Sequence, residues 1–139
     1  MIEVFYETDF ELVNLDKYVD WVSRIIVNED KTLGLINYVF CDDKYLLALN
    51  QEHLGHDTYT DIITFDYSQE NELISDIYIS IERVKENART FNQKVQMEIL
   101  RVMAHGVLHL CGYNDKNDMD KNLMRIKEEE SINMFHVEQ

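Results

Sequence analysis

The feature that most constrains this chain is the run from His105 to Asp115, which reads His-Gly-Val-Leu-His-Leu-Cys-Gly-Tyr-Asn-Asp. His105 and His109 stand four residues apart in an apolar segment, so on a helix they share one face, one turn from each other. Gly112 follows where a helix end favours a residue that can adopt a left-handed conformation, and Asp115 then arrives from outside the helix. Two imidazoles and one carboxylate, with a fourth position left to water, are typical of a catalytic zinc site.

These residues also allow a simpler interpretation. A single histidine on an apolar helix usually fills the core or the surface, and a carboxylate after a helix end is common on ordinary surfaces. Burying two imidazoles, however, costs free energy unless their nitrogens find partners, which a metal would supply. We therefore expect His105, His109 and Asp115 to bind one Zn²⁺ per chain, although the same ligands also accept nickel, cobalt or iron. Cys111, two residues after His109, points to another face and is expected to be packed.

The residue between the two histidines separates this motif from that of the zinc peptidases. A zinc ion with an open position lowers the pKa of its bound water toward ~7 and polarises a phosphoryl or carbonyl oxygen. Peptidases use His-Glu-x-x-His-x-x-Gly-x-x-His, in which the residue after the first histidine is the general base. This chain shares the spacing, but Gly106 stands at the base position and Asp115 at the third ligand. The motif predicts a zincin-like site at a helix end that lacks the base needed to cleave amides.

The composition narrows the possible partners and the location. With 139 residues, 45% of them hydrophobic, the chain suits one domain (residues 1–139) with a sizeable core. Its formal net charge of −14 argues against non-specific binding to nucleic acid or anionic membrane, because both need a positive field. The sequence has no signal-peptide pattern, no apolar stretch long enough to span a membrane and two distant cysteines, so we expect a cytoplasmic protein without disulfides.

Hydrophobic periodicity predicts an α+β fold with a small mixed sheet of four strands packed against about five helices. Alternating or β-branched segments predict strands, the last two paired as a hairpin, at residues 2–6, 33–40, 62–67 and 73–80. Apolar residues at helical spacing predict helices at residues 11–28, 43–53, 81–92, 94–111 and 118–135.

Short polar residues ahead of the first three helices are the expected caps. Thr8 or Asp9 is the candidate for the first helix, Asp42 or Asp43 for the second and Ser80 for the third. Proline is absent from the chain, so helix ends depend on such caps and on glycine.

One window of the sequence is locally basic although the chain is acidic. Between residues 83 and 101 five cations outnumber the acidic residues of the same stretch: Arg83, Lys85, Arg89, Lys94 and Arg101. The window is either an ordinary solvated helix face or a strip that borders the metal site and guides phosphates to it.

The motif residues match a known pattern. The run His105-Gly-x-Leu-His109-Leu-x-Gly112-Tyr113 resembles the signature of the YbeY family, bacterial single-strand-specific endoribonucleases of ribosomal RNA maturation. Two earlier blocks are similar to that family as well: Leu49-Asn50 with Asp57 and Thr60-Asp61-Ile62-Ile63-Thr64-Phe65, and Ser75-Asp76-Ile77-Tyr78-Ile79-Ser80. The match points run from about residue 46 to the end of the chain.

The resemblance implies an α+β fold with a four-stranded sheet and a metal, usually zinc, held by the three motif ligands. It also implies rRNA processing with ribosomal proteins or assembly factors as partners. Two positions depart from the family pattern: Asp115 replaces the usual third histidine, and Leu54 replaces a usual arginine that would suit a phosphate. His56 or an arginine of the basic window is the candidate substitute for that arginine.

The resulting hypothesis is a metal-dependent endoribonuclease in which RNA lies across residues 62–65 and the metal, and the metal-bound water or the neighbouring ribose 2′-OH attacks. No catalytic residue beyond that water is identified. The candidate substrate-binding residues are His56, Thr60, Asp61, Arg83 and Arg89. Thr60 and Asp61 fit equally well as a turn with a local side-chain hydrogen bond, and Tyr113 could stack on a base or pack on its helix.

Two other functions remain open from the sequence. A zinc peptidase-like hydrolase would need a catalytic carboxylate from elsewhere in the chain, for which Glu98 and Asp61 are candidates. A non-catalytic ribosome-assembly factor would use the acidic surface to dock on a basic ribosomal protein. RNA cleavage that is lost when His109 is replaced would favour the endoribonuclease over both of these functions.

Overall fold

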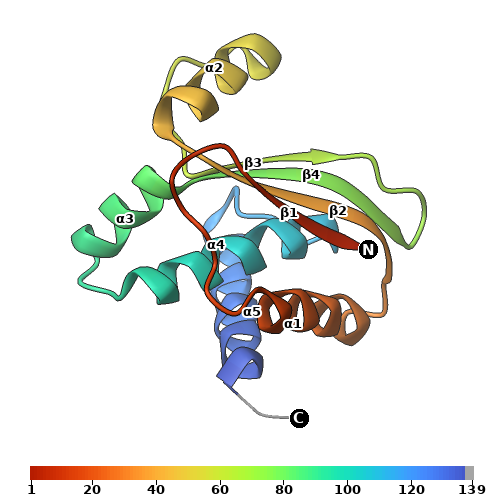
Figure 1. Cartoon of the computed structure of the whole chain (residues 1–139). Helices are drawn as coiled ribbons and strands as arrows, with labels where there is room; N and C mark the ends of the chain where they lie inside the picture. The colour runs from red at the N-terminus through yellow and green to blue at the C-terminus, as the bar shows by residue number, and fades with distance from the viewer. Residues whose placement is uncertain (137–139) are drawn as a thin grey trace.

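The protein folds into a four-stranded sheet with helices on both faces (Figure 1). The structure is a computed structural model that describes residues 1–136. In chain order the elements are β1 Ile2–Tyr6, α1 Leu15–Asn28, β2 Thr32–Cys41, α2 Asp43–Leu54, β3 Ile62–Asp66, β4 Glu72–Ser80, α3 Ile81–Thr90, α4 Val95–Leu110 and α5 Asp118–His136. Across these residues the five helices and the mixed sheet confirm the predicted α+β class. None of the helices within residues 1–136 combines the length and apolar character needed to cross a bilayer.

The strand order β1-β2-β4-β3 makes β3 an edge strand. β1 and β4 run parallel to β2, whereas β3 pairs antiparallel with β4, with Ile62 opposite Ile79 and Asp66 opposite Ser75. The predicted hairpin between the last two strands is therefore confirmed. Because no strand of the described chain covers the outer edge of β3, this edge is open to a ligand.

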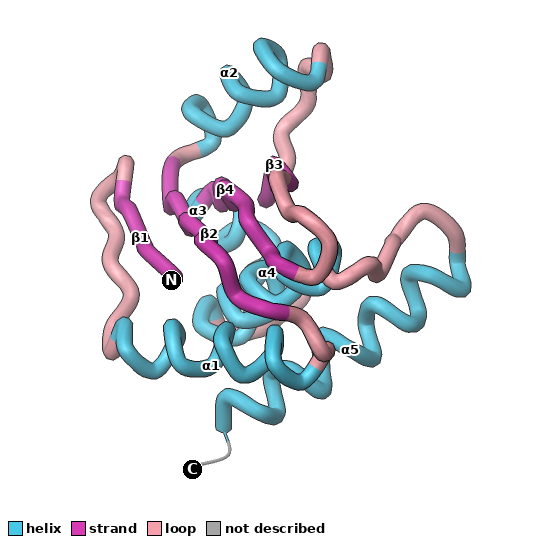
Figure 2. Tube along the Cα trace, turned by 90° about the vertical axis from the view of Figure 1, so that its right-hand side faces the viewer, coloured by secondary structure: helices cyan, strands magenta, loops and turns pink. Residues whose placement is uncertain are grey.

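The two faces of the sheet are covered unequally. α1, α4 and α5 lie on one side and α2 lies on the other (Figure 2). The main core fills the first side, where Trp21, Tyr38 and Leu100 are fully buried. A smaller cluster around Leu46 and Ile63 seats α2 on the opposite side. α4 thus lies inside the protein with apolar neighbours around most of its circumference, and its C-terminal end emerges beside β3.

Gly106 lies at a close contact between α4 and the sheet. A Cβ built on this residue would lie 3.0 Å from Cδ1 of Ile62 and 3.3 Å from two side-chain atoms of Ile77. The glycine therefore faces the sheet and lets the helix approach it closely. His105 and His109, on another face of the same helix, are consequently held at the edge of β3.

The first helix begins later than its periodicity predicts. It starts at Leu15 rather than residue 11, after Asn14 in a left-handed conformation (φ 67°), so neither Thr8 nor Asp9 caps it. Leu12 is buried although it lies outside the helix, and its N–H donates to the Tyr6 hydroxyl at 3.1 Å. Burial of a loop leucine extended the apolar pattern beyond the helix, which explains the error.

The other two predicted caps are present. The Asp42 side chain accepts a hydrogen bond from Tyr45 N–H at 2.8 Å, and the Ser80 hydroxyl accepts one from Arg83 N–H at 3.2 Å. Both bonds satisfy an N–H group that the first turn of a helix otherwise leaves unpaired. The bounds of the remaining elements lie within two residues of those predicted.

Candidate metal centre

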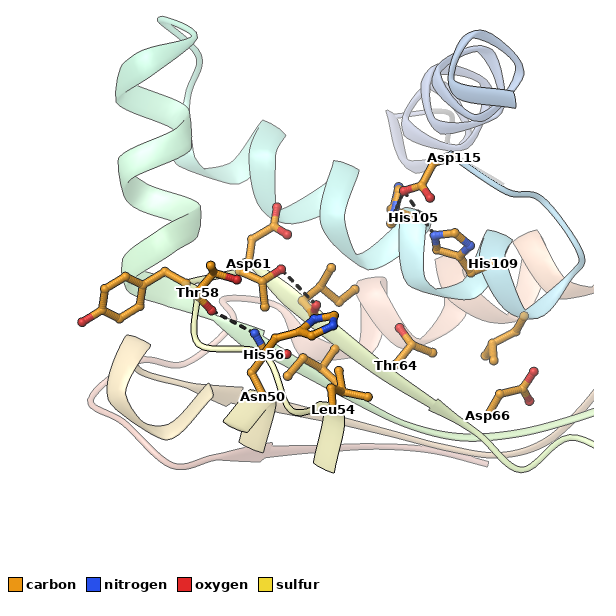
Figure 3. Close-up of a pocket in the computed structure, with 15 residues that line it drawn as sticks. Asn50, Leu54, His56, Thr58, Asp61, Thr64, Asp66, His105, His109 and Asp115 are labelled. Carbon is orange, nitrogen blue, oxygen red and sulfur yellow. Dashed lines mark hydrogen bonds and ion pairs between the residues drawn. The ribbon is translucent and has the colours of Figure 1, made fainter. Parts of the chain in front are cut away.

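Three predicted ligand side chains meet at the end of α4. Nε2 of His105 lies 3.3 Å from Asp115 Oδ2, and Nε2 of His109 lies 3.5 Å from the same oxygen. One donor atom from each residue lies within 4.8 Å of the other two, so the group could hold a metal ion. Ligands placed 2.0–2.1 Å from a tetrahedral zinc would be about 3.3 Å apart, which these separations match. Figure 3 shows the three side chains together at one wall of a pocket.

The turn after α4 explains why Asp115 reaches the histidines. Gly112 adopts φ 108°, a conformation that favours glycine, and Tyr113 N–H donates back to the Leu108 carbonyl at 3.1 Å. The Tyr113 hydroxyl donates to Glu29 at 2.7 Å, and the Lys127 ammonium lies 5.6 Å from the ring centroid. Of the two sequence interpretations of Tyr113, the structure favours packing, and this packing anchors the loop that carries Asp115.

Cys111 lies near the ligands without joining them. Burial, with the nearby carboxylate of Glu29, raises the pKa of its thiol to about 11. The side chain is therefore a neutral thiol near pH 7, whereas metals bind the thiolate. The predicted packing role of Cys111 agrees with this position.

Glu128 is a neighbour of the candidate metal centre, and it was not identified from the sequence. Its Oε2 lies 2.6 Å from Nδ1 of His105, on the side of the ring opposite Asp115. The residue is 5% exposed. The available signal was its place on the buried stripe of α5, at helical spacing from Met124 and Phe135. A carboxylate on a buried helix stripe indicates a buried partner.

A partly buried cluster of charges continues from Glu128 toward β3. The Arg101 guanidinium lies 2.6 Å from Glu98, 3.3 Å from Asp61 and 3.7 Å from Glu128. Burial lowers the pKa of Arg101, but the hydrogen bond to Glu98 and the charges of the three carboxylates outweigh it and raise the pKa above its usual value. Asp61 also accepts from Asn87 Nδ2 at 3.4 Å. Glu98 and Asp61, the two candidate bases of a peptidase, are thus both paired with Arg101.

A cavity of about 650 Å³ opens beside the three ligands. Its walls come from β3, the end of α4, the end of α2 and the loop between α2 and β3. Asn50, 3% exposed, holds that loop: its Nδ2 donates to the Thr58 carbonyl at 2.9 Å, and Gly55 turns the chain with φ 67°. Leu54, at the position where an arginine was expected from the family pattern, lines the cavity as well.

The predicted substrate-binding residues divide into two groups. His56, Thr60 and Asp61 line the cavity, with His56 across it from the histidine pair (Figure 3). Arg83 and Arg89 do not line it: Arg83 pairs with Asp43 at 2.8 Å and Arg89 with Glu86 at 2.8 Å. Among the described residues no lysine or arginine lines the cavity. Arg101 and Arg83 of the basic window lie behind its walls, where Arg101 contacts Asp61 and Arg83 lies over the Tyr59 ring.

Comparison with known proteins identifies the family of the chain and agrees with its fold. Residues 4–136 match the family model described as Endoribonuclease YbeY. The chain belongs to the YbeY family. The endoribonuclease YbeY of Flavobacterium johnsoniae is 56% identical over 139 residues, covering 100% of both chains, and that of Christiangramia forsetii is 51% identical over 138 residues, covering 99% of this chain and 96% of that protein.

A solved structure extends the likeness to three dimensions. The solution structure of TM1509 from Thermotoga maritima matches 97% of this chain and 89% of its own, with a TM-score of 0.70 and 27% identity. Membership of the YbeY family favours an endoribonuclease over the zinc peptidase-like hydrolase and the non-catalytic assembly factor. The orientation of Gly106 adds a physical reason against the peptidase alone, because a base at this position would face the sheet and not the cavity.

Proposed function

We propose that the chain is a Zn²⁺-dependent endoribonuclease that cleaves single-stranded RNA during ribosomal RNA maturation in the cytoplasm, working with ribosomal proteins or assembly factors. The observation that carries the proposal is the convergence of His105, His109 and Asp115 on one point at the wall of an open cavity. Family membership supplies the RNA substrate class.

The chain's own residues suggest how RNA is received. A zinc ion bound by the three ligands would polarise a phosphoryl oxygen and supply a water of lowered pKa. β3 offers its open edge along the cavity, so an extended strand of RNA can lie beside Ile62 and Thr64. His56 can donate a hydrogen bond to a phosphate from the opposite wall. Because cationic side chains are scarce at this cavity and the net charge is −14, the site suits a short single strand better than a duplex.

The proposal is tested by measuring metal content and RNA cleavage together. Wild-type protein, His109→Ala and Asp115→Ala are purified alike, and elemental analysis gives the moles of each metal per chain. We expect about one zinc per wild-type chain and loss of the ion in both variants. Cleavage should fall by at least about 100-fold, because removing only an outer partner of a metal ligand already costs up to about 100-fold. His136→Ala, an exposed histidine at the end of α5, is the matched control and should keep both. Unchanged cleavage by both variants would refute the proposal.

Tyr59 is expected to stack on a base at the rim of this cavity. The Tyr59 side chain lines the cavity and is 57% exposed. The Arg83 guanidinium lies 5.2 Å from the centroid of its ring and is held in place by Asp43, 2.8 Å away. Stacking of a base on an aromatic side chain contributes about 1–3 kcal/mol. Tyr59→Ala should therefore weaken binding of a short labelled single-stranded RNA by about 5- to 150-fold, whereas Tyr59→Phe should not.

Binding is measured by fluorescence anisotropy on metal-free protein, so that the RNA is not cleaved. Tyr67→Ala is the control, because Tyr67 is 56% exposed but does not line the cavity. Equal affinities of wild type and Tyr59→Ala would show that the ring takes no part in binding.

A further inference from the structure

The two ring nitrogens of His105 face two different carboxylates. Nε2 lies 3.3 Å from Asp115 Oδ2, and Nδ1 lies 2.6 Å from Glu128 Oε2. Asp115 is at the cavity wall, whereas Glu128 is 5% exposed and does not line the cavity. The Glu128 carboxylate therefore has no direct contact with a substrate in the cavity, and it can affect the site only through its contact with His105 or through its charge.

We propose that Glu128 is a positioning residue for the metal ligand His105, an inference that rests on the proposed function. Both ring nitrogens face a carboxylate, but the contact of Nδ1 with Glu128, at 2.6 Å, is shorter than that of Nε2 with Asp115, at 3.3 Å. This geometry favours the neutral tautomer that donates from Nδ1 to Glu128, which leaves the Nε2 lone pair free for a metal ion. The contact also holds the plane of the ring, because turning it would break a buried, charge-assisted hydrogen bond.

The helix that carries Glu128 is itself held firmly in place. Trp21, with no exposed surface, donates from Nε1 to the Ser131 carbonyl at 2.6 Å, one turn beyond Glu128. Met124 and Phe135 are buried on the same stripe of α5, at 2% and 3% exposure. Glu128 is thus presented to His105 from a packed helix and not from a mobile surface side chain.

The surrounding charges give Glu128 a second effect on a cation. Three carboxylates, those of Glu98, Asp61 and Glu128, share the single guanidinium of Arg101. The cluster therefore keeps an excess of negative charge in a largely buried setting, where charges interact more strongly than in water. A divalent ion at Nε2 of His105 would offset that excess, so removing the Glu128 charge should weaken metal binding even if the ring stayed in place.

Glu128→Gln tests the inference because it keeps the shape of the side chain and removes its charge. Zinc affinity is measured by competition with a chromophoric chelator, at a temperature at which every variant is folded. We expect affinity to fall about 10- to 100-fold, as for other outer partners of metal-ligating histidines. We also expect a changed visible spectrum of the cobalt-substituted protein. Glu129→Gln, the exposed neighbour on the same helix, should match wild type in both measurements.

A measurement on unmutated protein keeps the test independent of folding of the variant. Long-range ¹H–¹⁵N correlation spectra of the metal-free protein distinguish the two neutral tautomers of a histidine. We expect His105 to carry its proton on Nδ1, as the contact with Glu128 requires. A neutral His105 protonated on Nε2 would overturn the inference.

The outcomes separate this inference from the proposed function. If wild type takes up no metal, the proposed function fails. If wild type binds zinc and Glu128→Gln binds it within twofold of wild type, the positioning role fails while the metal site stands. A Glu128→Gln variant that only melts at a lower temperature, with unchanged zinc affinity and an unchanged cobalt spectrum, would show that Glu128 is structural and would equally overturn the inference.

Discussion

Replacing Gly106 with glutamate is expected to lower the free energy of unfolding by about 3–5 kcal/mol, the cost of leaving a buried charge without its partner, and to create no peptidase activity. By sequence alone the substitution supplies the general base of the zinc-peptidase pattern, with Asp115 still in place of its third histidine. In the structure, however, a Cβ at this position lies 3.0 Å from Ile62 and 3.3 Å from Ile77. The new carboxylate would be driven into the contact between α4 and the sheet, away from the three ligands, without a cation to pair with it.

Chemical denaturation of the metal-free proteins measures this effect. Gly106→Ala is the control, because its gain in helix propensity of about 1 kcal/mol opposes the crowding by the terminal carbon of Ile62, and we expect it to stay within about 1 kcal/mol of wild type. A stable Gly106→Glu protein would show that the contact between helix and sheet can open at this point. Hydrolysis of a peptide panel by that protein would mean that the side chain reaches the cavity after all.

The parts of the fold with a regular pattern could be predicted from the sequence. Alternation along residues 73–80 and helical spacing along residues 94–111 placed β4 and α4 correctly, because each element buries one face in the same core. Local chemistry placed the caps Asp42 and Ser80. The strand order, with β3 at the edge, could not be predicted in this way, because pairing partners are far apart in the chain.

The candidate site was predictable only where its residues are close in sequence. His105, His109 and Asp115 share one helix end and one turn, so their spacing indicated a common point. Glu128 is 23 residues from His105, and Asp61 is 40 residues from Arg101, and no periodicity links such pairs. The basic window did not identify the residues that line the cavity, because composition does not tell which way each side chain points. Arg89 pairs with Glu86 on the surface, whereas Arg101 turns into the protein.

Arg101→Met is expected to lower the free energy of unfolding of the metal-free protein by about 3 kcal/mol, at the lower end of the cost of breaking a buried ion pair because the arginine side chain is 33% exposed. The methionine fills much of the space of the arginine stem but leaves Glu98, with 4% of its side chain exposed, and Glu128, with 7%, without their shared cation. Chemical denaturation gives the free-energy change.

Arg89→Met is a close control for Arg101→Met, because Arg89 and Glu86 have the same i, i+3 spacing as Arg101 and Glu98 but 76% and 48% exposed side chains. Exposed pairs of this kind contribute about 0–1 kcal/mol, so Arg89→Met should leave stability nearly unchanged. Equal losses for the two variants would mean that the carboxylates around Arg101 do not depend on it. A large loss for Arg101→Met that shrinks when zinc is added would instead show that the bound ion and the guanidinium offset the same negative charge. A ligand that binds the folded state stabilises it by an amount that rises with the logarithm of its affinity, so the difference shrinks only if the variant binds zinc more tightly than wild type.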